Sequence, residues 1–291
     1  MSVNKIITDN IIKLIEGANI SDFESPLQSL SLAGEQKSLA TGNAYTGINQ
    51  LITLLSAANN RYTSGNWGTL KQFSKLNKRI RKEELKKSTC ITFYKTLTKE
   101  DDSGNESSFP MLRYYRVYNE AQTEGYEPPK SNPNITREYA PAIDKLVKSH
   151  NVKLLTGGIA CYSPNDDAIT MPDFAEFCET SDKTIKENYY STLLHELTHW
   201  TGHSSRLNRD FGNKFKSQKY AREELVAEIG AVFLSLEYGV AGKNLNNHGA
   251  YLKSWLQLLK SDPKAIFNAV RDAKKAFNFL TQKEFNQSIA A

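Results

Sequence analysis

Apolar residues recur along the first part of the chain at two spacings, one typical of helices and one of strands. Isoleucine, leucine and aromatic residues at helical spacing predict three helices, over residues 5–17, 48–58 and 67–76. Residues 89–97 and 111–118 are rich in β-branched and aromatic residues, and we predict that they pair as a β-hairpin. The acidic segment 99–108 is expected to connect the two strands.

The second part of the chain predicts mainly helices. They are expected over residues 139–149, from 189 onward, over 220–231 and twice within 250–281, with short strands around 153–171. The last two helices should separate at Pro263, because proline cannot continue a helix. The fold class that this order of elements predicts is α+β.

One proline-containing segment, residues 127–134, is the clearest linker. We therefore predict two domains, residues 1–130 and 131–291. A chain of 291 residues is long enough for each domain to bury its own hydrophobic core.

Composition excludes several classes of protein. The hydrophobic content of 39% and the charged content of 24% are ordinary for a globular protein. No run approaches eighteen apolar residues and the N-terminus lacks a signal-peptide core, so neither a membrane partner nor secretion is expected. Cys90, Cys161 and Cys178 are scattered and odd in number, which favours a reducing cytoplasm over a disulfide framework.

Positive charge is concentrated in residues 61–95, which hold ten of the lysines and arginines but only two acidic residues. Aromatic residues are interleaved with them. Cations that neutralise phosphates and aromatic rings that stack on bases are what single-stranded DNA requires. The candidate contacts are Trp67, Lys71, Lys75, Lys78, Arg79 and Arg81. The alternative is a solvated helix face with aromatic residues in the core, and composition alone leaves it open.

The strongest chemical motif is His195-Glu196-Leu197-Thr198-His199. Positions i and i+4 lie on one face of a helix, so His195 and His199 can reach one metal ion while Glu196 projects toward its water. This arrangement is typical of zinc hydrolases, in which Zn²⁺ lowers the pKa of a water to about 7 and a carboxylate takes the proton. The alternative is a surface helix with two unrelated histidines.

A tetrahedral catalytic zinc needs a third protein ligand. The string Glu224-Leu-Val-Ala-Glu228 lies some twenty-five residues downstream and resembles the second zinc helix of the gluzincin peptidases. That resemblance implies that Glu224 binds the metal and that Glu228 orients a histidine. Glu223, Glu228 and His203 remain alternatives for the third ligand. A solvated acidic face is the other interpretation of this helix, but small Ala227, Gly230 and Ala231 favour close packing on another helix.

Over nearly its whole length the chain resembles the ArdC-type antirestriction proteins of conjugative plasmids and phages. The matching strings are GNAYTGIN (42–49), WGTLKQF (67–73), YRVYNEAQTEG (115–125), ACYSPNDDAITMP (160–172), HELTHWTGHSSRLNR (195–209), residues 223–228 and YLKSWLQLLKSD (251–262). The resemblance implies an N-terminal domain that binds single-stranded DNA and a zincin-like metallopeptidase domain. It also implies a role in shielding incoming DNA from host restriction.

The expected activity is hydrolysis of a peptide bond in a host protein, with Glu196 as general base and the substrate extended along residues 160–171. A second interpretation is a DNA-protecting protein whose zinc site is structural or catalytically silent. A third is metal-assisted cleavage of nucleic acid, but nucleases more often use oxygen-rich or two-metal sites.

Overall fold

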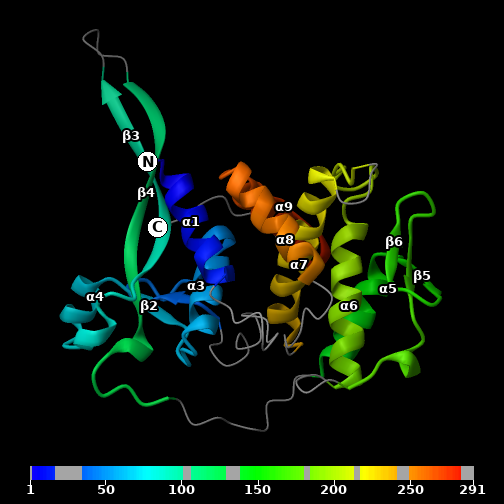
Figure 1. Cartoon of the computed structure of the whole chain (residues 1–291), viewed down its shortest axis with the longest axis horizontal. Helices are drawn as coiled ribbons and strands as arrows, with labels where there is room; N and C mark the ends of the chain where they lie inside the picture. The colour runs from blue at the N-terminus through cyan, green and yellow to red at the C-terminus, as the bar shows by residue number, and fades with distance from the viewer. Residues whose placement is uncertain are drawn as a thin grey trace.

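The first part of the chain forms a small sheet whose last two strands continue into a long hairpin (Figure 1). The computed structural model describes residues 2–16, 35–100, 106–128, 138–179, 184–212, 217–240 and 249–282. The strand order is β1-β2-β4-β3, with β1 (Lys37–Ser38), β2 (Asn66–Gly68), β3 (Thr89–Glu100) and β4 (Glu106–Asn119). The predicted hairpin is confirmed, and it is longer than predicted, because backbone pairing continues to Glu100 and Glu106.

Helices surround the base of this hairpin. They are α1 (Val3–Glu16), α3 (Gly47–Asn59) and α4 (Leu70–Lys75), with 3₁₀ turns η2 (Lys82–Glu84) and η3 (Glu120–Gln122). The predicted start of α4 at residue 67 is wrong. Trp67 belongs to β2, where it pairs with Asn119, and the helix begins only after Thr69. Thr69 and Gln72 form a capping box there, which satisfies backbone N–H groups at the helix start.

The second part combines helices with a three-stranded sheet. Its elements are α5 (Tyr139–Ser149), β5 (Lys153–Thr156), β6 (Cys161–Ser163), β7 (Ala168–Met171), η4 (Phe174–Glu176), α6 (Ile185–Trp200), α7 (Gln218–Tyr238), α8 (Gly249–Ser261) and α9 (Ala265–Thr281). Strand β7 lies in the middle, parallel to β5 and antiparallel to β6. The predicted helices and strands are therefore present, and α7 is longer than predicted. Among the described helices, none has the length and apolar character to cross a membrane.

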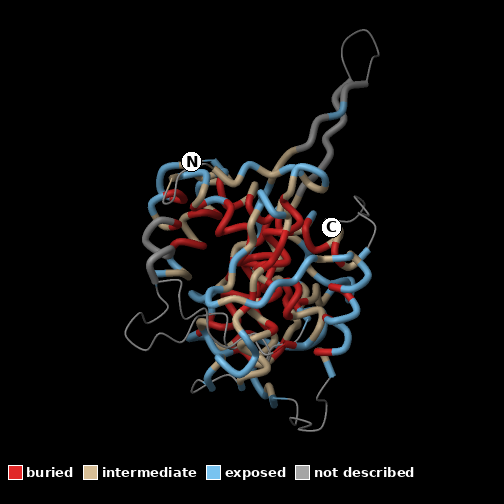
Figure 2. The backbone as a smooth tube through the Cα atoms, turned by 90° about the vertical axis from the view of Figure 1, so that its right-hand side faces the viewer, coloured by how far each residue is buried: buried red, intermediate tan, exposed pale blue. Residues whose placement is uncertain are grey.

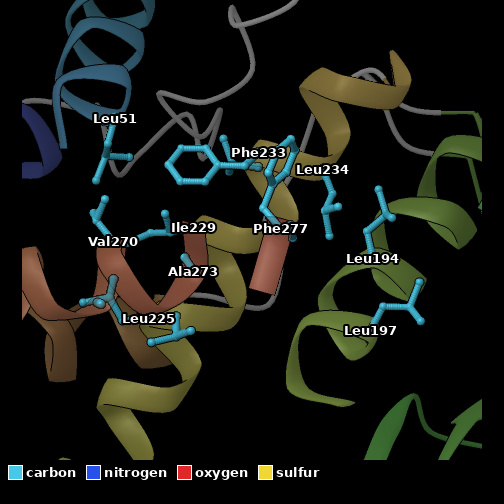
Figure 3. Packing of buried hydrophobic residues seen from close by; sticks show 14 of the residues in the cluster. Leu51, Leu194, Leu197, Leu225, Ile229, Phe233, Leu234, Val270, Ala273 and Phe277 are labelled. Atoms are coloured by element: carbon cyan, nitrogen blue, oxygen red, sulfur yellow. The ribbon is translucent and has the colours of Figure 1, made fainter. Parts of the chain in front are cut away.

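The largest hydrophobic core joins the two parts of the chain. Ile7 of α1 and Leu51 of α3 belong to the same buried cluster as residues of α6, α7 and α9. Figure 3 shows Leu51 facing Val270 of α9, and Figure 2 shows the buried backbone at the centre of the molecule. The hydroxyl of Thr8 also donates to the carbonyl oxygen of Pro263, at 2.7 Å.

The prediction that each domain buries a separate core is therefore wrong for α1 and α3. Smaller clusters do stabilise the N-terminal sheet by itself, around Trp67 and around Phe73. The domain boundary predicted near residue 130 falls at residues 129–137, outside the described residues, and stays a prediction.

Candidate functional site

Helix α6 places the two histidines of the motif one turn apart. The helix begins at a capping box in which Thr184 and Glu187 satisfy each other's backbone N–H groups. His195 and His199 are near its C-terminal end, with their Nε2 atoms 3.1 Å apart. Glu196 lies on the same helix and is 7% exposed. Both histidine side chains thus direct the same ring nitrogen toward one point.

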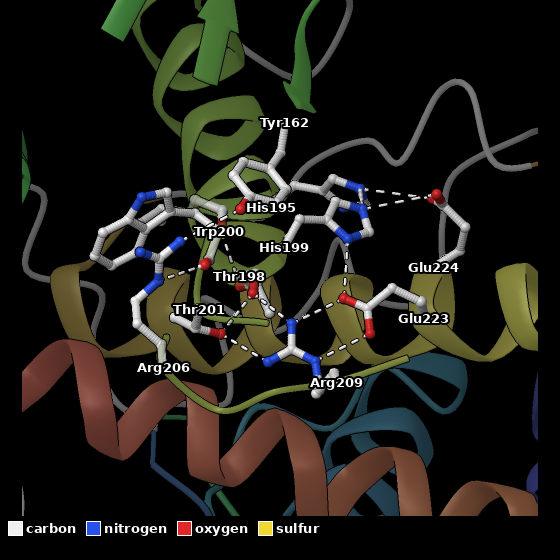
Figure 4. Close-up of polar contacts among 11 residues, drawn as sticks. Tyr162, His195, Thr198, His199, Trp200, Thr201, Arg206, Arg209, Glu223 and Glu224 are labelled. Atoms are coloured by element: carbon white, nitrogen blue, oxygen red, sulfur yellow. Dashed lines mark hydrogen bonds and ion pairs between the residues drawn. The ribbon is translucent and has the colours of Figure 1, made fainter. Parts of the chain in front are cut away.

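Helix α7 brings a carboxylate to that point. Glu224 Oε2 lies 3.7 Å from His195 Nε2, and Glu224 Oε1 lies 3.7 Å from His199 Nε2 (Figure 4). Among the described residues, these three side chains form the group whose possible ligand atoms all lie within 4.8 Å of one another. Bonds of about 2.0–2.1 Å in a tetrahedral zinc site separate ligand atoms by roughly 3.3 Å. The donor set therefore fits a divalent metal ion.

Two further carboxylates of α7 fix the rings of the histidines. Glu228 Oε1 lies 3.0 Å from His195 Nδ1, and Glu223 Oε1 lies 3.1 Å from His199 Nδ1. When Nδ1–H donates to a carboxylate, the lone pair of Nε2 is left for a metal ion. Each histidine thus has its own orienting glutamate, and both glutamates lie on α7.

Glu223 is itself held by a buried arginine. Arg209 donates from Nε to Glu223 Oε2 at 3.0 Å and from Nη2 to Oε1 at 2.8 Å. Its Nη1 donates to Thr201 Oγ1 and its Nη2 to the carbonyl oxygen of Thr198 (Figure 4). The side chains of Arg209 and Glu223 are only 8% and 5% exposed. The sequence interpretation treated Glu223 only as an alternative ligand. The string at 195–209 ends on Arg209, but nothing in the sequence pairs this arginine with Glu223.

Electrostatics at the site favour a cation. Burial by itself would raise the pKa of Glu223, but hydrogen bonds from His199 and Arg209 hold it below its usual value. Burial would likewise lower the pKa of His195, but the neighbouring carboxylates of Glu228 and Glu224 raise it well above its usual value. The pKa of Glu224 is also held below its usual value, by His195 and His199 against the effect of burial, so Glu223 and Glu224 retain their charge inside the protein. A metal ion at this point would replace the proton on His195.

The other candidates for a third ligand are engaged elsewhere. Glu223 and Glu228 face the Nδ1 sides of the two rings. His203 lies beyond the end of α6, and its Nδ1 contacts the hydroxyl and backbone N–H of Ser205 at 2.8 and 3.2 Å. The interpretation of the α7 glutamates as a solvated face is wrong, because Glu223, Glu224 and Glu228 are 4%, 7% and 3% exposed. That Glu224 binds a metal stays a prediction.

Close packing sets the distance between α6 and α7. A Cβ added at Gly230 would lie 2.4 Å from Thr198 Cγ2, which is far inside van der Waals contact. The small residues of α7 had predicted such packing, and it is confirmed at Gly230. Because Thr198 lies next to His199, this contact controls how near the carboxylates of α7 approach the imidazoles of α6.

The three-stranded sheet is attached to the end of α6 through Arg206. This arginine donates to Asp167 Oδ2 at 2.9 Å and to the carbonyl oxygen of Trp200 at 2.7 Å. Its guanidinium also lies 3.7 Å above the ring of Trp200. Asp167 accepts from the hydroxyl of Tyr162 on β6 at 2.9 Å. These contacts hold edge strand β6 beside α6, the helix that carries His195 and His199.

The N-terminal candidates separate into buried and exposed residues. Trp67 is 0% exposed, and its Nε1–H donates to Gln36 Oε1 at 2.6 Å inside the sheet. A ring in that position cannot stack on a base, so the predicted DNA contact of Trp67 is wrong. Two other aromatic residues of the basic segment, Tyr62 and Phe73, are also buried.

Two of the predicted basic contacts stabilise the fold locally. Lys78 forms an ion pair with Glu120. Arg81 donates from Nη1 to the carbonyl oxygens of Ala121 and Thr123, at 3.0 and 2.9 Å. The remaining basic candidates are exposed and have no ion-pair partner among the described residues; they are Lys71, Lys75 and Arg79.

Known families match both parts of the chain. Residues 1–118 match the N-terminal domain of the anti-restriction factor ArdC, and residues 141–272 match a zincin-like metallopeptidase family. The ArdC antirestriction protein from the R388 plasmid is 31% identical. Its metal-free crystal structure superposes with a TM-score of 0.74 over 97% of each chain, and its Mn(II)-bound structure with 0.73 over 99% of this chain and 100% of that one.

Curated relatives also share the sequence. An uncharacterized protein, y4eC, of Sinorhizobium fredii is 31% identical over 284 residues, which are 94% of this chain and 90% of the relative. A DNA primase TraC of Escherichia coli is 31% identical over 267 residues, but that region is only 18% of the primase. These matches confirm the expected resemblance, the α+β fold and the zincin-like second domain.

Proposed function

Because the chain belongs to the ArdC family of antirestriction proteins, we propose that it binds single-stranded DNA and hydrolyses peptide bonds at the site formed by His195, His199 and Glu224. The observation that carries the peptidase proposal is the convergence of these three side chains, with a glutamate behind each imidazole. A purely structural zinc site closes its coordination with four protein ligands, whereas catalytic sites use three.

Each residue of the site has a proposed role. His195, His199 and Glu224 would hold the metal, which when bound polarises a carbonyl and acidifies a water. Glu196 accepts the proton of that water and returns it to the amine that leaves. Glu223 and Glu228 keep the two imidazoles in the tautomer that presents Nε2.

The substrate is proposed to be an extended peptide. Strand β6 is an edge of its sheet and pairs with β7 on one side only. The backbone groups on its other side can bind a peptide as an added strand. This peptide would lie beside α6, because Arg206 connects the sheet to the end of that helix. A host protein is the proposed source of that peptide.

We propose zinc as the metal. Two imidazoles and one carboxylate are a donor set that zinc accepts in catalytic sites. Manganese generally binds nitrogen-containing sites more weakly than zinc does. Metal analysis of protein purified without added metal, followed by competition between Zn²⁺ and Mn²⁺, tests this choice. Full occupancy by manganese in the presence of equal zinc would contradict it.

The DNA-binding proposal is supported by the exposed lysines and arginines of the N-terminal part. Lys71, Lys75 and Arg79 are exposed on and just after α4. The test uses the whole chain, because a fragment ending near residue 130 would expose the apolar faces of α1 and α3. Fluorescence anisotropy with labelled single-stranded and duplex oligonucleotides should show preferential binding to the single strand that weakens as salt rises.

The peptidase proposal is tested with intact protein and Glu196→Gln. Both are incubated with bacterial extract, with and without single-stranded DNA, and new peptide N-termini are identified by mass spectrometry. The intact protein should create new N-termini and the variant should not, although the variant retains its metal. If the metal-loaded intact protein produces no more new N-termini than Glu196→Gln, the chain is a DNA-protecting protein with a silent metal site.

A further inference from the structure

Among the side chains that the structure describes, the exposed aromatic residues of the N-terminal part lie outside the basic segment 61–95. Tyr62, Trp67 and Phe73 are all buried. Tyr114 and Tyr115 of strand β4 are 41% and 43% exposed. Arginines flank them on both sides, at Arg113 and Arg116, and both are exposed. The hairpin therefore combines accessible rings with positive charge.

The two tyrosines point to opposite faces of the hairpin, because neighbouring residues of a strand alternate. Tyr115 pairs with Ile91, and its ring packs edge-on against Phe93 at a centroid distance of 5.7 Å. Ile91 and Val117, on that same face, pack against Ala57 of α3. Helix α3 thus covers the base of this face, and it also contacts the other face, where the backbone N–H and the hydroxyl of Thr92, opposite Tyr114, donate to Asn49 Oδ1.

Tyr114 and Arg116 lie on the other face, together with Tyr118. The hydroxyl of Tyr118 donates to the carbonyl oxygen of Leu85 at 2.9 Å, so this face continues into the turn after η2. Leu85 is 43% exposed, and Lys86 next to it is also exposed. Neither Lys86 nor Arg116 has an ion-pair partner in the part of the chain that the structure describes. The result is a strip of exposed residues, Tyr114, Arg116 and Lys86, that borders the buried ring of Tyr118 and carries one aromatic ring and two cations.

We propose that this strip, formed by Tyr114, Arg116 and Lys86, is where a single strand of nucleic acid binds, with Tyr114 stacking on a base and the two cations on phosphates. The proposal rests on the proposed DNA binding and assigns it a surface. Charge complementarity identifies the polyanion, and the exposed ring identifies a strand whose bases are unstacked. A duplex offers phosphates but no free base face.

The stacking contact is tested by anisotropy of a fluorescein-labelled oligothymidylate with the full chain. Tyr114→Ala should weaken binding by about 5- to 100-fold, the range found when one stacked ring is removed. Tyr114→Phe keeps the ring and should bind within about twofold of the unmodified protein. Tyr115→Ala is the matched control, since it removes an equally exposed ring from the opposite face, and it should also stay within about twofold.

The phosphate contacts are tested through the salt dependence of binding. Each lost contact should reduce the slope of log K against log salt by roughly 0.7 for a single strand. Arg116→Ala and Lys86→Ala should each show that reduction, and Arg116→Lys should restore the slope. Lys153→Ala is the control, because Lys153 is exposed on β5, at the opposite side of the molecule from the hairpin (Figure 1).

The outcomes separate this proposal from the one on which it rests. If the unmodified protein does not bind the oligonucleotide, the proposed DNA binding fails. If it binds but folded Tyr114→Ala binds equally well, or Tyr115→Ala loses as much affinity, the assignment to this strip is overturned. Circular dichroism of each variant shows that the fold is kept, and Tyr114→Phe separates loss of stacking from loss of the hydroxyl.

Discussion

The α6–α7 site and the basic N-terminal segment both contain residues that the sequence marks as functional, but the fold brings together only the predicted residues of the α6–α7 site. At the site, the helical repeat brings His195 and His199 together, and it also places Glu224 and Glu228 on one face of α7. In the segment 61–95, the fold separates three aromatic rings from the cations, with Tyr62, Trp67 and Phe73 inside and most of the cations outside. Local periodicity therefore predicts relative positions along one element, whereas exposure depends on what packs against it.

The largest expected effect concerns the metal ligands. Glu224→Ala should abolish measurable metal binding, while Glu228→Ala should weaken it by on the order of 10- to 100-fold, because Glu228 orients His195 without binding the metal. His203→Ala should leave it unchanged, since His203 contacts Ser205 instead. Isothermal titration of metal-free protein with Zn²⁺ measures all three, and circular dichroism controls for unfolding. Zinc retained by folded Glu224→Ala but lost by folded His203→Ala would move the third ligand to His203.

A second prediction compares a buried and an exposed ion pair at neighbouring positions. Glu223→Ala leaves the buried guanidinium of Arg209 without its partner, which should reduce the free energy of unfolding by about 3–5 kcal/mol. Asp210→Ala breaks the exposed pair with Lys219, and its unfolding should be unchanged within error. Urea denaturation of metal-free protein measures both. Equal midpoints for the two variants would show that Arg209 is solvated in solution and does not hold Glu223.

The N-terminal counterpart is Trp67. Trp67→Ala removes a fully buried ring and should cost about 3–5 kcal/mol of stability. Trp67→Phe leaves Gln36 without its indole donor, and should be destabilised less while binding single-stranded DNA like the unmodified protein. The measurements are urea denaturation and oligonucleotide anisotropy. Weaker DNA binding by fully folded Trp67→Phe would show that the indole ring contacts DNA.

These contrasts show how far the sequence could predict the fold. Elements with strong periodicity and clear ends, such as the helix over 139–149, were predicted residue for residue. The start of α4 was misplaced because a two-residue pairing of β2 with β4 outweighs helical propensity at Trp67. The role of Arg209 could not be predicted, because it depends on a turn that brings its guanidinium to the carboxylate of Glu223. The common core of α3 and α9 depends on contacts between residues more than two hundred positions apart.

A smaller effect is expected where α6 and α7 touch. Gly230→Ala introduces a methyl group 2.4 Å from Thr198 Cγ2 and should cost about 1–3 kcal/mol, since the helices must separate to admit it. Metal affinity should fall as well, because Glu224 moves with α7. Thr198→Ala in the same chain removes the clashing atoms and should recover most of both losses. A double variant as impaired as Gly230→Ala alone would show that the contact does not set the helix distance.

The smallest effect is expected from the contact between the sheet and α6, where charge is only partly buried. The hydrogen bond from Arg206, opposed in part by burial, lowers the pKa of Asp167 to about 2. A carboxylate whose pKa is lower in the folded state stabilises the protein at pH values above its ordinary pKa of 3.8. This stabilisation disappears as the pH falls through about 2.

The variant Asp167→Asn removes the charge, and asparagine tolerates the positive φ of 45° at this position. The difference in melting temperature between the two proteins should therefore be constant above about pH 4 and vanish toward pH 2. It should correspond to less than about 1 kcal/mol, because the side chain of Asp167 is 37% exposed and solvent screens the pair. A melting-temperature difference that persists undiminished near pH 2 would mean that the hydrogen bonds of Asp167, rather than its charge, hold β6 against α6.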